Sequence, residues 1–468
     1  MTPQGHGEPA ADADTVPWQG SEISGGTVLG PAVQARDIHG DVYLGTGPPT
    51  PFRMPVPAQL PPEPALFTGR SRELATLNGL LAGEDPARPV TIIALTGMPG
   101  VGKTTLATWW LRQVRSNYPD GELFADLGGH MRDAPVGPGE ILAAFLRALN
   151  APPSRPGDLE ELAGAWRTAT TGRRLIVLLD NAASAAQARA LLPAGGPSLV
   201  VVTSRCTPSA LALDGARFTR LGPLDEPAAA GLFGLVLGDD RAAADPGAAR
   251  AVARLCGCLP LAVCVAGARH ALSPWRTAAQ IAGELASEQH RLASLTVPGD
   301  LSVRAAFDSS CQRLPPDAAR MYRLASLLPA GEFSAEQAAA AAATDPHQAA
   351  CLLDLLTEAS LLDEEPASRR YRFHPLIRLH ARGQAKDIEP AAEREAVAAR
   401  CTGWRPQAAV AGLAVIPGSY RLSSSAGPVT RTRSRAPPRP SVTSRHPARR
   451  SAPQPVPDRL IRRRPAER

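Results

Sequence analysis

The sequence is short of lysine, of aromatic residues and of long apolar runs. Lys and Arg together number 50, yet only Lys103 and Lys386 are lysines, and aromatic residues make up 4% of the 468 positions. No run approaches the roughly 18 apolar residues that a membrane span needs, and the N-terminus lacks the basic start and apolar core of a signal peptide. We therefore expect a cytoplasmic protein with no membrane span.

Cysteine is also sparse, and its spacing excludes the common cysteine-based sites. The seven cysteines form no CxxC pair and show no zinc-like spacing with His. This pattern predicts buried free thiols in a reducing compartment. Apolar residues make up 44% of the chain, enough to give each of two to four domains a core.

Charge is divided unevenly along the chain. Residues 401–468 hold 14 arginines against Asp458 and Glu467, an excess of 12 positive charges, so the overall charge of +6 leaves −6 for the first 400 residues. An acidic body is a poor general binder of nucleic acid, which leaves the basic tail as the one segment suited to it.

Apolar runs alternate with helical patterns between residues 66 and 205. Strands are predicted at 90–96, 121–127, 175–180 and 199–205, and helices after Gly102 to about Tyr118, at 140–149 and at 158–169. This alternation predicts an α/β P-loop NTPase fold with a parallel sheet and helices on both faces.

A phosphate-binding loop follows the first of these strands. "GMPGVGKTT" satisfies GxxxxGK[ST] and opens a helix, the context that the motif's mechanics require. In a chain that uses Arg almost everywhere, a retained lysine indicates a need for a compact ammonium among phosphates. The predicted nucleotide-binding residues of this loop are Gly97, Gly100, Gly102, Lys103, Thr104 and Thr105, with the Thr104 hydroxyl on Mg²⁺.

The ends of two later strands supply the remaining catalytic candidates. Asp180 ends "LIVLLD" and is predicted to hold Mg²⁺ together with Thr104. Asn181 follows it where many hydrolytic P-loop proteins carry an acidic residue, and an amide cannot accept a proton from water. Arg205 ends the strand "LVVVTSR" and is placed to sense a γ phosphate. The catalytic candidates are therefore Lys103, Asp180 and Arg205, and the amide at Asn181 predicts at most a slow ATPase.

The ordered motifs resemble a known class of signalling ATPases. "FTGRSREL", "GMPGVGKTT", "LIVLLDN", "VVTSR", "LGPLDE", "GCLPLAV" and "RFHPLIRLHA" resemble the NB-ARC class of signal-transduction ATPases (STAND) over residues 60–385. The resemblance implies bound ATP or ADP with Mg²⁺, and a helical domain and a winged-helix domain closing over the nucleotide. By position it places Phe67, Gly69 and Arg70 near adenine, Pro260 against it, and His374 on the β phosphate.

Two residues depart from the pattern of this class. Pro375 stands where Asp usually follows the histidine, and Cys258 where Gly often precedes "LPLA". These departures predict an ADP-bound closed state that is looser than in typical relatives.

The expected domain organisation has seven segments. They are a disordered leader (1–24), an amyloid-type signalling motif (25–45), a Pro-rich linker (46–64), the P-loop nucleotide-binding domain (65–222), a helical domain (223–298), a winged-helix domain (299–386) and an Arg/Pro/Ser-rich tail (387–468). Two interpretations of the tail remain open. It is a shifted reading frame or degenerate remnant, which we favour, or a basic arm for nucleic acid or acidic partners.

The motif at 25–45 resembles the RIP homotypic interaction motif and bacterial amyloid signalling motifs. Alternating Val and Ile, turn glycines and Gln34 suit cross-β stacking, whereas Arg36 stands where Gly is expected. The resemblance implies self-association and an effector protein that carries a matching motif. The alternative is a disordered leader with no such role.

Three functions fit these features. The first is a nucleotide-controlled switch that oligomerises in signal transduction or defence and recruits an effector through its N-terminal motif. The second is an NB-ARC-type transcriptional regulator that binds DNA, although residues 1–60 leave no room for the usual N-terminal DNA-binding domain. The third is a P-loop metabolic kinase, which Asn181 argues against.

Overall fold

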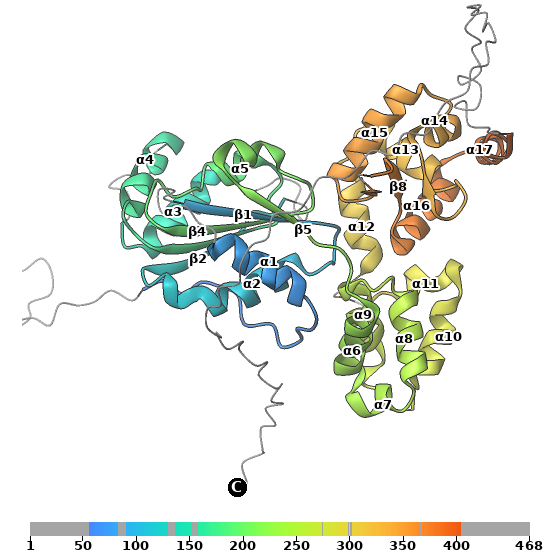
Figure 1. Ribbon diagram of the computed structural model, residues 1–468, viewed down its shortest axis with the longest axis horizontal. Coiled ribbons are helices and arrows are strands. Elements are labelled where there is room, and N and C mark those ends of the chain that lie inside the picture. Colours follow the sequence, from blue (N-terminus) through green and yellow to red (C-terminus); the bar gives the residue numbers. More distant parts are fainter. Residues whose placement is uncertain are drawn as a thin grey trace, which may run out of the picture. The chain divides into compact units, whose positions relative to one another are not determined.

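The structure is a computed structural model (Figure 1). It describes residues 56–82, 90–129, 136–151, 158–273, 275–297, 299, 302–365 and 367–403. The predicted signalling motif at 25–45 and the Arg-rich part of the tail lie outside these ranges. No helix in the described ranges is long and apolar enough to cross a membrane.

A five-stranded parallel sheet forms the first half of the described chain. Its strands are β1 (Val90–Thr96), β2 (Gly121–Asp126), β3 (Leu175–Asp180), β4 (Ser198–Ser204) and β5 (Arg217–Arg220), in the order β2-β3-β4-β1-β5. The four apolar strands predicted from the sequence are confirmed to within one residue. The strand β5 was not predicted, because its mostly exposed "RFTR" has no apolar run and pairs with β1 alone at the sheet edge.

Helices pack on both faces of the sheet because neighbouring residues of a strand point to opposite sides. Ile93 of β1 lies in one core with Trp110, and Ile92 lies in a second core with Phe145 and Trp166. The flanking elements are α1 (Ser71–Ala82), α2 (Lys103–Val114), η1 (Arg115–Asn117), α3 (Pro138–Ala148), α4 (Leu159–Thr170), α5 (Ala185–Arg189) and η2 (Ser209–Asp214). The parallel α/β fold predicted from the sequence is therefore present.

The described part of the Pro-rich linker lies against the open edge of the sheet. Glu122 of β2 donates its backbone N–H to Pro57 O at 2.7 Å, and Gln59 donates to Glu122 O at 2.9 Å. A Cβ on Gly121 would lie 2.5 Å from Pro57 Cγ, so this close approach requires glycine there. The segment is extended, but backbone hydrogen bonds dock it on the domain.

Within the described residues, six helices lie between the parallel sheet and residue 295. They are α6 (Glu226–Leu237), α7 (Asp239–Ala243), α8 (Pro246–Leu255), α9 (Pro260–Ala271), α10 (Ala278–Ala286) and α11 (Glu288–Ser294). Asp225 and Asp245 cap α6 and α8 by accepting backbone N–H bonds, and Pro260 occupies the first turn of α9, where no N–H partner is needed. These local signals are those that sequence alone predicts for a helical region.

The last described segment combines helices with a small antiparallel sheet. The strands β6 (Glu332–Phe333), β8 (Arg370–Arg372) and β7 (Asp363–Glu365) lie in that order. The helices are α12 (Val303–Cys311), α13 (Pro316–Ala325), α14 (Ala335–Ala342), α15 (Pro346–Glu358), α16 (Pro375–Ile388) and α17 (Ala391–Gly403). The strands β7 and β8 form an antiparallel hairpin.

Helical packing continues beyond residue 386, where we expected the tail to begin. Val397 of α17 is fully buried, and the guanidinium of Arg400 donates to Ala340 O and Ala341 O of α14 at 2.9 and 2.7 Å. Residues 391–403 therefore belong to the packed part of the chain.

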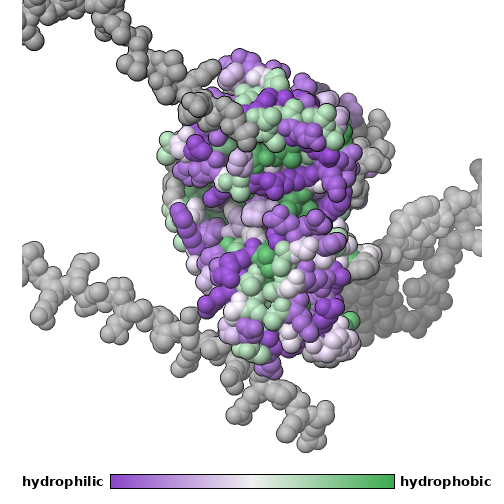
Figure 2. Space-filling view, turned by 90° about the vertical axis from the view of Figure 1, so that its right-hand side faces the viewer, coloured by the Kyte–Doolittle hydropathy of each residue, from purple (hydrophilic) through white to green (hydrophobic). Residues whose placement is uncertain are grey.

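On the face drawn in Figure 2, hydrophobic residues are interspersed among hydrophilic ones in small groups.

Candidate nucleotide-binding site

The loop between β1 and α2 depends on glycines in the left-handed region. Gly97, Gly100 and Gly102 have φ of 144°, 76° and 90°. A Cβ on Gly97 would lie 2.5 Å from Leu221 O, and one on Gly100 would lie 2.6 Å from Leu261 Cβ. Since no side chain caps α2, its first backbone N–H groups are available to a bound anion.

Lys103 lies almost entirely inside this loop. Its side chain donates from Nζ to Gly97 O at 2.8 Å and to Met98 O at 3.1 Å, and the residue is 7% exposed. Burial, together with the nearby Arg205 guanidinium, lowers the pKa of Lys103 to about 7. Within the described chain this ammonium donates only to carbonyl oxygens, and the Asp180 carboxylate raises its pKa less than burial lowers it. A bound phosphate group would supply a countercharge in direct contact.

Oxygen ligands meet at the carboxyl ends of β3 and β4. Thr104 Oγ1 donates to Asp180 Oδ1 at 2.7 Å, and Thr203 Oγ1 donates to the same oxygen at 2.5 Å. Burial raises the pKa of Asp180, and the carboxylate of Asp126 adds to that rise, although both threonine bonds oppose it. Hydroxyl and carboxylate oxygens next to a phosphate loop fit Mg²⁺, which prefers a few carboxylates plus substrate phosphates.

Asn181 adopts a left-handed conformation beside these ligands, with φ of 54°. Its side-chain amide donates to Asp126 Oδ1 at 3.1 Å and to Asp180 Oδ2 at 3.2 Å. Asp126 ends β2, which pairs with β3 so that Asp126 and Asp180 are register partners. Our sequence reasoning missed Asp126, although an acidic residue ending the neighbouring strand was a visible signal.

Arg205 connects the sheet to the last described segment. Its Nη1 donates to Ala306 O at 3.0 Å and to Ser309 Oγ at 2.6 Å, both in α12. Burial lowers the pKa of this guanidinium, and nearby Asp180 only partly opposes that. The same residue also lines the phosphate-loop cavity.

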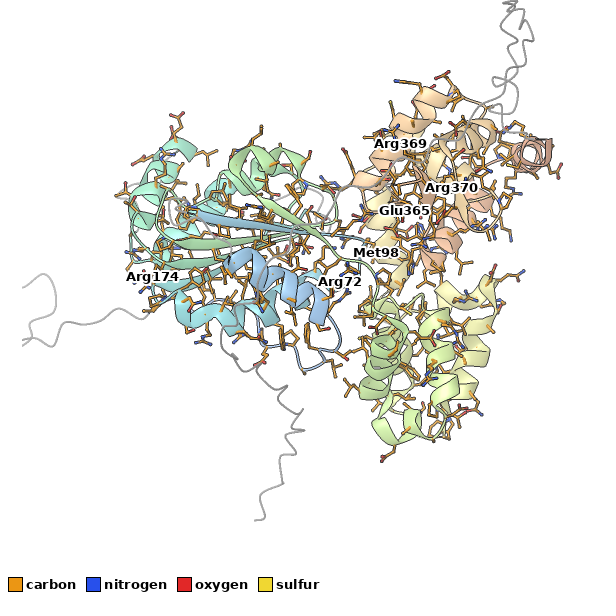
Figure 3. The ribbon with its side chains drawn as sticks, viewed as in Figure 1. Arg72, Met98, Arg174, Glu365, Arg369 and Arg370 are labelled. Atoms are coloured by element: carbon orange, nitrogen blue, oxygen red, sulfur yellow. The ribbon has the colours of Figure 1, made fainter. Side chains whose placement is uncertain are left out.

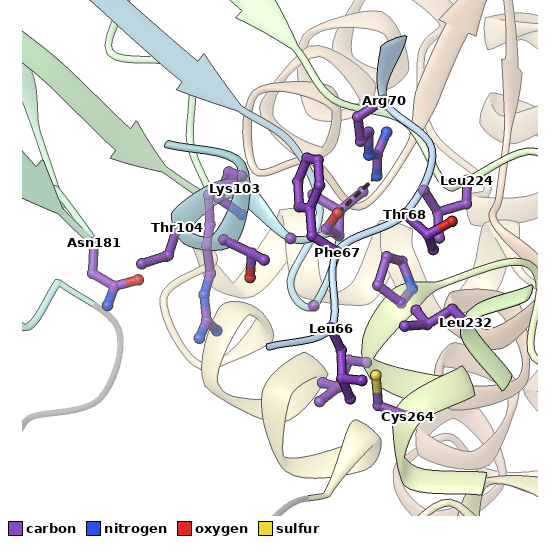
Figure 4. Close-up of a pocket in the computed structure, with 17 residues that line it drawn as sticks. Leu66, Phe67, Thr68, Arg70, Lys103, Thr104, Asn181, Leu224, Leu232 and Cys264 are labelled. Atoms are coloured by element: carbon purple, nitrogen blue, oxygen red, sulfur yellow. Dashed lines mark hydrogen bonds between the residues drawn. The ribbon is translucent and has the colours of Figure 1, made fainter. Parts of the chain in front are cut away.

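A cavity of about 420 Å³ opens over the loop (Figure 4). One end is polar and contains Lys103, Thr104, Asn181 and Arg205. The other end is apolar and is lined by Leu66, Phe67, Val101, Leu224, Leu232, Pro260, Leu261 and Cys264. A polar end with cationic residues and an apolar end suit a phosphate chain attached to a planar base.

Hydrogen bonds and an aromatic stack hold the loop at residues 66–70 against the P-loop domain. Arg70 donates from Nη2 to Val101 O and from Nη1 to Gly222 O, both at 2.8 Å (Figure 4). Phe67 stacks on Trp109 with ring centroids 4.4 Å apart. Arg70 therefore holds the loop against the domain with both ends of its guanidinium, besides lining the cavity.

The structure brings most, but not all, of the predicted site residues to this cavity. Nine line it: Phe67, Arg70, Gly100, Gly102, Lys103, Thr104, Thr105, Pro260 and Arg205. Gly97 and Asp180 contact it indirectly, through Lys103 and Thr104. Gly69 lies outside the lining. Leu261 and Cys264 of α9 line the cavity and were missed, because apolar residues on a helix carry no signal in sequence alone.

His374 lies on a different cavity. It is 6% exposed, its Nε2 lies 2.8 Å from Gly257 O, and its Nδ1 accepts the Leu376 N–H at the start of α16. Burial lowers its pKa, so the ring is neutral at pH 7. His374 and Met98 of the phosphate loop do line one small cavity together.

Family comparison agrees with this geometry. Residues 88–192 match the family described as "AAA domain". Residues 88–192 thus belong to an AAA-type P-loop NTPase domain. The chain is 40% identical over 346 residues to Regulatory protein AfsR of Streptomyces griseus, covering 74% of this chain and 35% of that protein. Over 338 residues it is also 40% identical to Regulatory protein AfsR of Streptomyces coelicolor, covering 71% and 34%. The chain thus spans about a third of the length of these relatives.

Solved structures were found with lower similarity. A STAND protein with a tetratricopeptide repeat sensor from Pyrococcus horikoshii is 17% identical, with a TM-score of 0.30, covering 74% of this chain and 46% of that one. A Walker-type ATPase of Pyrococcus abyssi is 15% identical, with a TM-score of 0.44, covering 68% and 96%.

Proposed function

We propose that the chain is an ATP/ADP-binding regulatory switch of the NB-ARC type. The observation that carries the proposal is that elements outside the P-loop domain form part of its nucleotide cavity. Pro260 and Leu261 of α9 line the cavity, and Leu261 N donates to Gly100 O of the phosphate loop at 3.1 Å. Arg205 extends this connection to α12. Nucleotide occupancy therefore acts on α9 and α12 directly.

In this proposal each residue at the polar end of the cavity has a role. Lys103 and the α2 N–H groups would bind the β and γ phosphates, and Thr104 and Asp180 would hold Mg²⁺, which would shield the phosphate charge. Asn181 cannot take a proton from an attacking water, so hydrolysis is slow and the bound nucleotide persists. Slow turnover suits a switch, because the signal lasts as long as the triphosphate.

We further propose that residues 299–386 act as a winged-helix domain that reports the nucleotide through His374. Its hairpin β7–β8 and the helices around it support this assignment. Gly257 stands directly against the His374 ring, where a Cβ would lie 2.4 Å from Cε1. Contact between His374 and a β phosphate therefore requires the segment around Gly257 to shift.

Exchange of ADP for ATP would release α12 from Arg205, because a γ phosphate attracts the guanidinium more strongly than neutral serine oxygens do. In this proposal the opened chains self-associate, which concentrates the leaders at 25–45 and recruits an effector with a like motif.

Two measurements test this switch. Mass spectrometry of nucleotide released from heat-denatured protein should find ADP or ATP at close to one per chain. Light scattering should then show a larger assembly with a non-hydrolysable ATP analogue than with ADP. Lys103→Ala should abolish both results, and Lys386→Ala, which removes an exposed lysine, should leave both unchanged. Equal assembly of all three proteins in both nucleotides would refute the switch.

A second function, regulation by DNA binding, is favoured by the 40% identity to proteins named as regulatory. Retention on DNA should then fall steeply with salt and persist in a chain that ends at residue 403. Loss of retention in that shorter chain would assign binding to the Arg-rich tail.

A further inference from the structure

A second cavity, of about 600 Å³, lies between α11 and the last described segment. Its lining comes from α11, the loop before α6, the turn between α8 and α9, the loop after α13, the three strands of the small sheet and the first turns of α16. It shares only Leu224 with the nucleotide cavity. A volume of this size lies within the range of small-molecule sites.

Four arginines line this second cavity: Arg291, Arg372, Arg378 and Arg382. The carboxylates in the lining are Glu288 and Asp363, and Asp363 is paired with Arg220 at 3.1 Å. Across the described residues, no carboxylate comes within ion-pair distance of any of these four arginines. With His374 neutral, the lining carries an excess of two positive charges.

Backbone carbonyls fix three of these guanidinium groups from one side. Arg378 donates from Nε to Ser326 O at 3.2 Å, and Arg382 donates from Nε to the same oxygen at 3.1 Å. Arg291 donates to Leu285 O and Ala286 O. These bonds orient each guanidinium group and leave at least one of its terminal nitrogens available to a ligand. Binding an anion would therefore cost little side-chain entropy, because the arginines are already ordered.

The rest of the lining favours an anion with an organic part. Phe333, Phe373 and Leu379 give one wall an apolar surface. The 14-residue helix α16 starts at Pro375, and its first two turns, at the positive end of the helix dipole, contribute to the lining. Arg378 and Arg382 are one helical turn apart, a spacing that lets two forked guanidinium groups hold one phosphate.

We propose that this second cavity binds a phosphorylated small metabolite carrying at least two negative charges. Because its walls come from α11 and α16, ligand binding there would hold the helical region and the last segment together. The site would thus add a chemical input to the chain that is separate from the nucleotide.

Isothermal titration with inorganic pyrophosphate tests the site. The protein is first saturated with ADP, and the titration is repeated with Lys103→Ala protein, in which the phosphate loop is disabled. The test variants are Arg372→Gln, which removes an exposed guanidinium that has no hydrogen bond to any described residue, and Arg382→Gln. Arg369→Gln is the matched control, because Arg369 is an exposed arginine just before β8 that does not line the cavity (Figure 3).

Saturable binding at one pyrophosphate per chain is expected in both backgrounds. Each test variant should weaken it by about tenfold or more, as expected for loss of a charge-assisted hydrogen bond, and Arg369→Gln should not change it. The proposal is overturned if no saturable binding occurs, if both test variants bind as the wild type does, or if citrate binds as tightly as pyrophosphate. Loss of binding in the ADP-filled protein would also overturn the proposal, because ADP would then compete for the same site.

Discussion

The buried state of Lys103 predicts that nucleotide affinity depends on pH in a specific way. Because its pKa without ligand is lowered to about 7, the ammonium is mostly deprotonated above that pH. Bound phosphate stabilises the charged form, so binding takes up a proton and weakens as pH rises. The charged fraction of Lys103 is about one quarter at pH 7.5 and about one hundredth at pH 9, so ADP should bind about twentyfold more weakly at pH 9.

Fluorescent ADP titrations at the two pH values measure this ratio in a range where phosphate is fully ionised. Lys103→Arg is the matched control, since guanidinium stays charged throughout and should remove the dependence. If that variant does not bind, calorimetry of the wild type in buffers of different ionisation heat should still detect about one proton taken up per ADP. Equal affinities at both pH values, or no proton uptake, would refute the assignment of Lys103 as a buried phosphate ligand.

Three substitutions test the backbone contacts around the two cavities. Gly100→Ala should lower ADP affinity and stability, because the new Cβ would lie 2.6 Å from Leu261 Cβ of α9. Gly79→Ala is the control: a Cβ there has nothing within 4 Å and should stabilise helix α1 by about 0.5–1 kcal/mol. Thermal melts with and without ADP compare the two variants. Gly257→Ala should lower the melting temperature by displacing the His374 ring, and Gly283→Ala in α10, also in open space, should raise it slightly. Cys258→Gly should stabilise the chain by about 1 kcal/mol, because Cys258 adopts a left-handed conformation with φ of 55°. Urea unfolding measures this change, and an unchanged unfolding midpoint would count against backbone strain at Cys258.

The parallel sheet and the phosphate loop were predictable because their signals are local. Buried strands such as Leu175–Asp180 are continuous apolar runs, and the loop's glycines, lysine and threonine stand at fixed spacing. Helix starts at Asp225, Asp245 and Pro260 likewise follow from capping chemistry. In each case, neighbouring residues determine the conformation.

Contacts between distant segments could not be predicted in the same way. The bonds from Arg205 to α12 join residues about 100 positions apart, and nothing near "VVTSR" distinguishes a γ-phosphate ligand from a brace between segments. The position of His374 behind Gly257 depends on how two segments pack. The edge strand β5 and the helix α17 were missed because their stability comes from a partner surface more than from their own periodicity.

The most direct test is amide hydrogen exchange in α12. It measures whether the nucleotide bound at the phosphate loop changes the stability of α12 in the last described segment. Protection of Val303–Cys311 should be lower with a non-hydrolysable ATP analogue than with ADP, since the γ phosphate draws Arg205 away from Ser309. The difference should vanish in Arg205→Ala, which has no guanidinium to move. Equal protection of α12 in the wild type with both nucleotides, at confirmed full occupancy, would contradict the account.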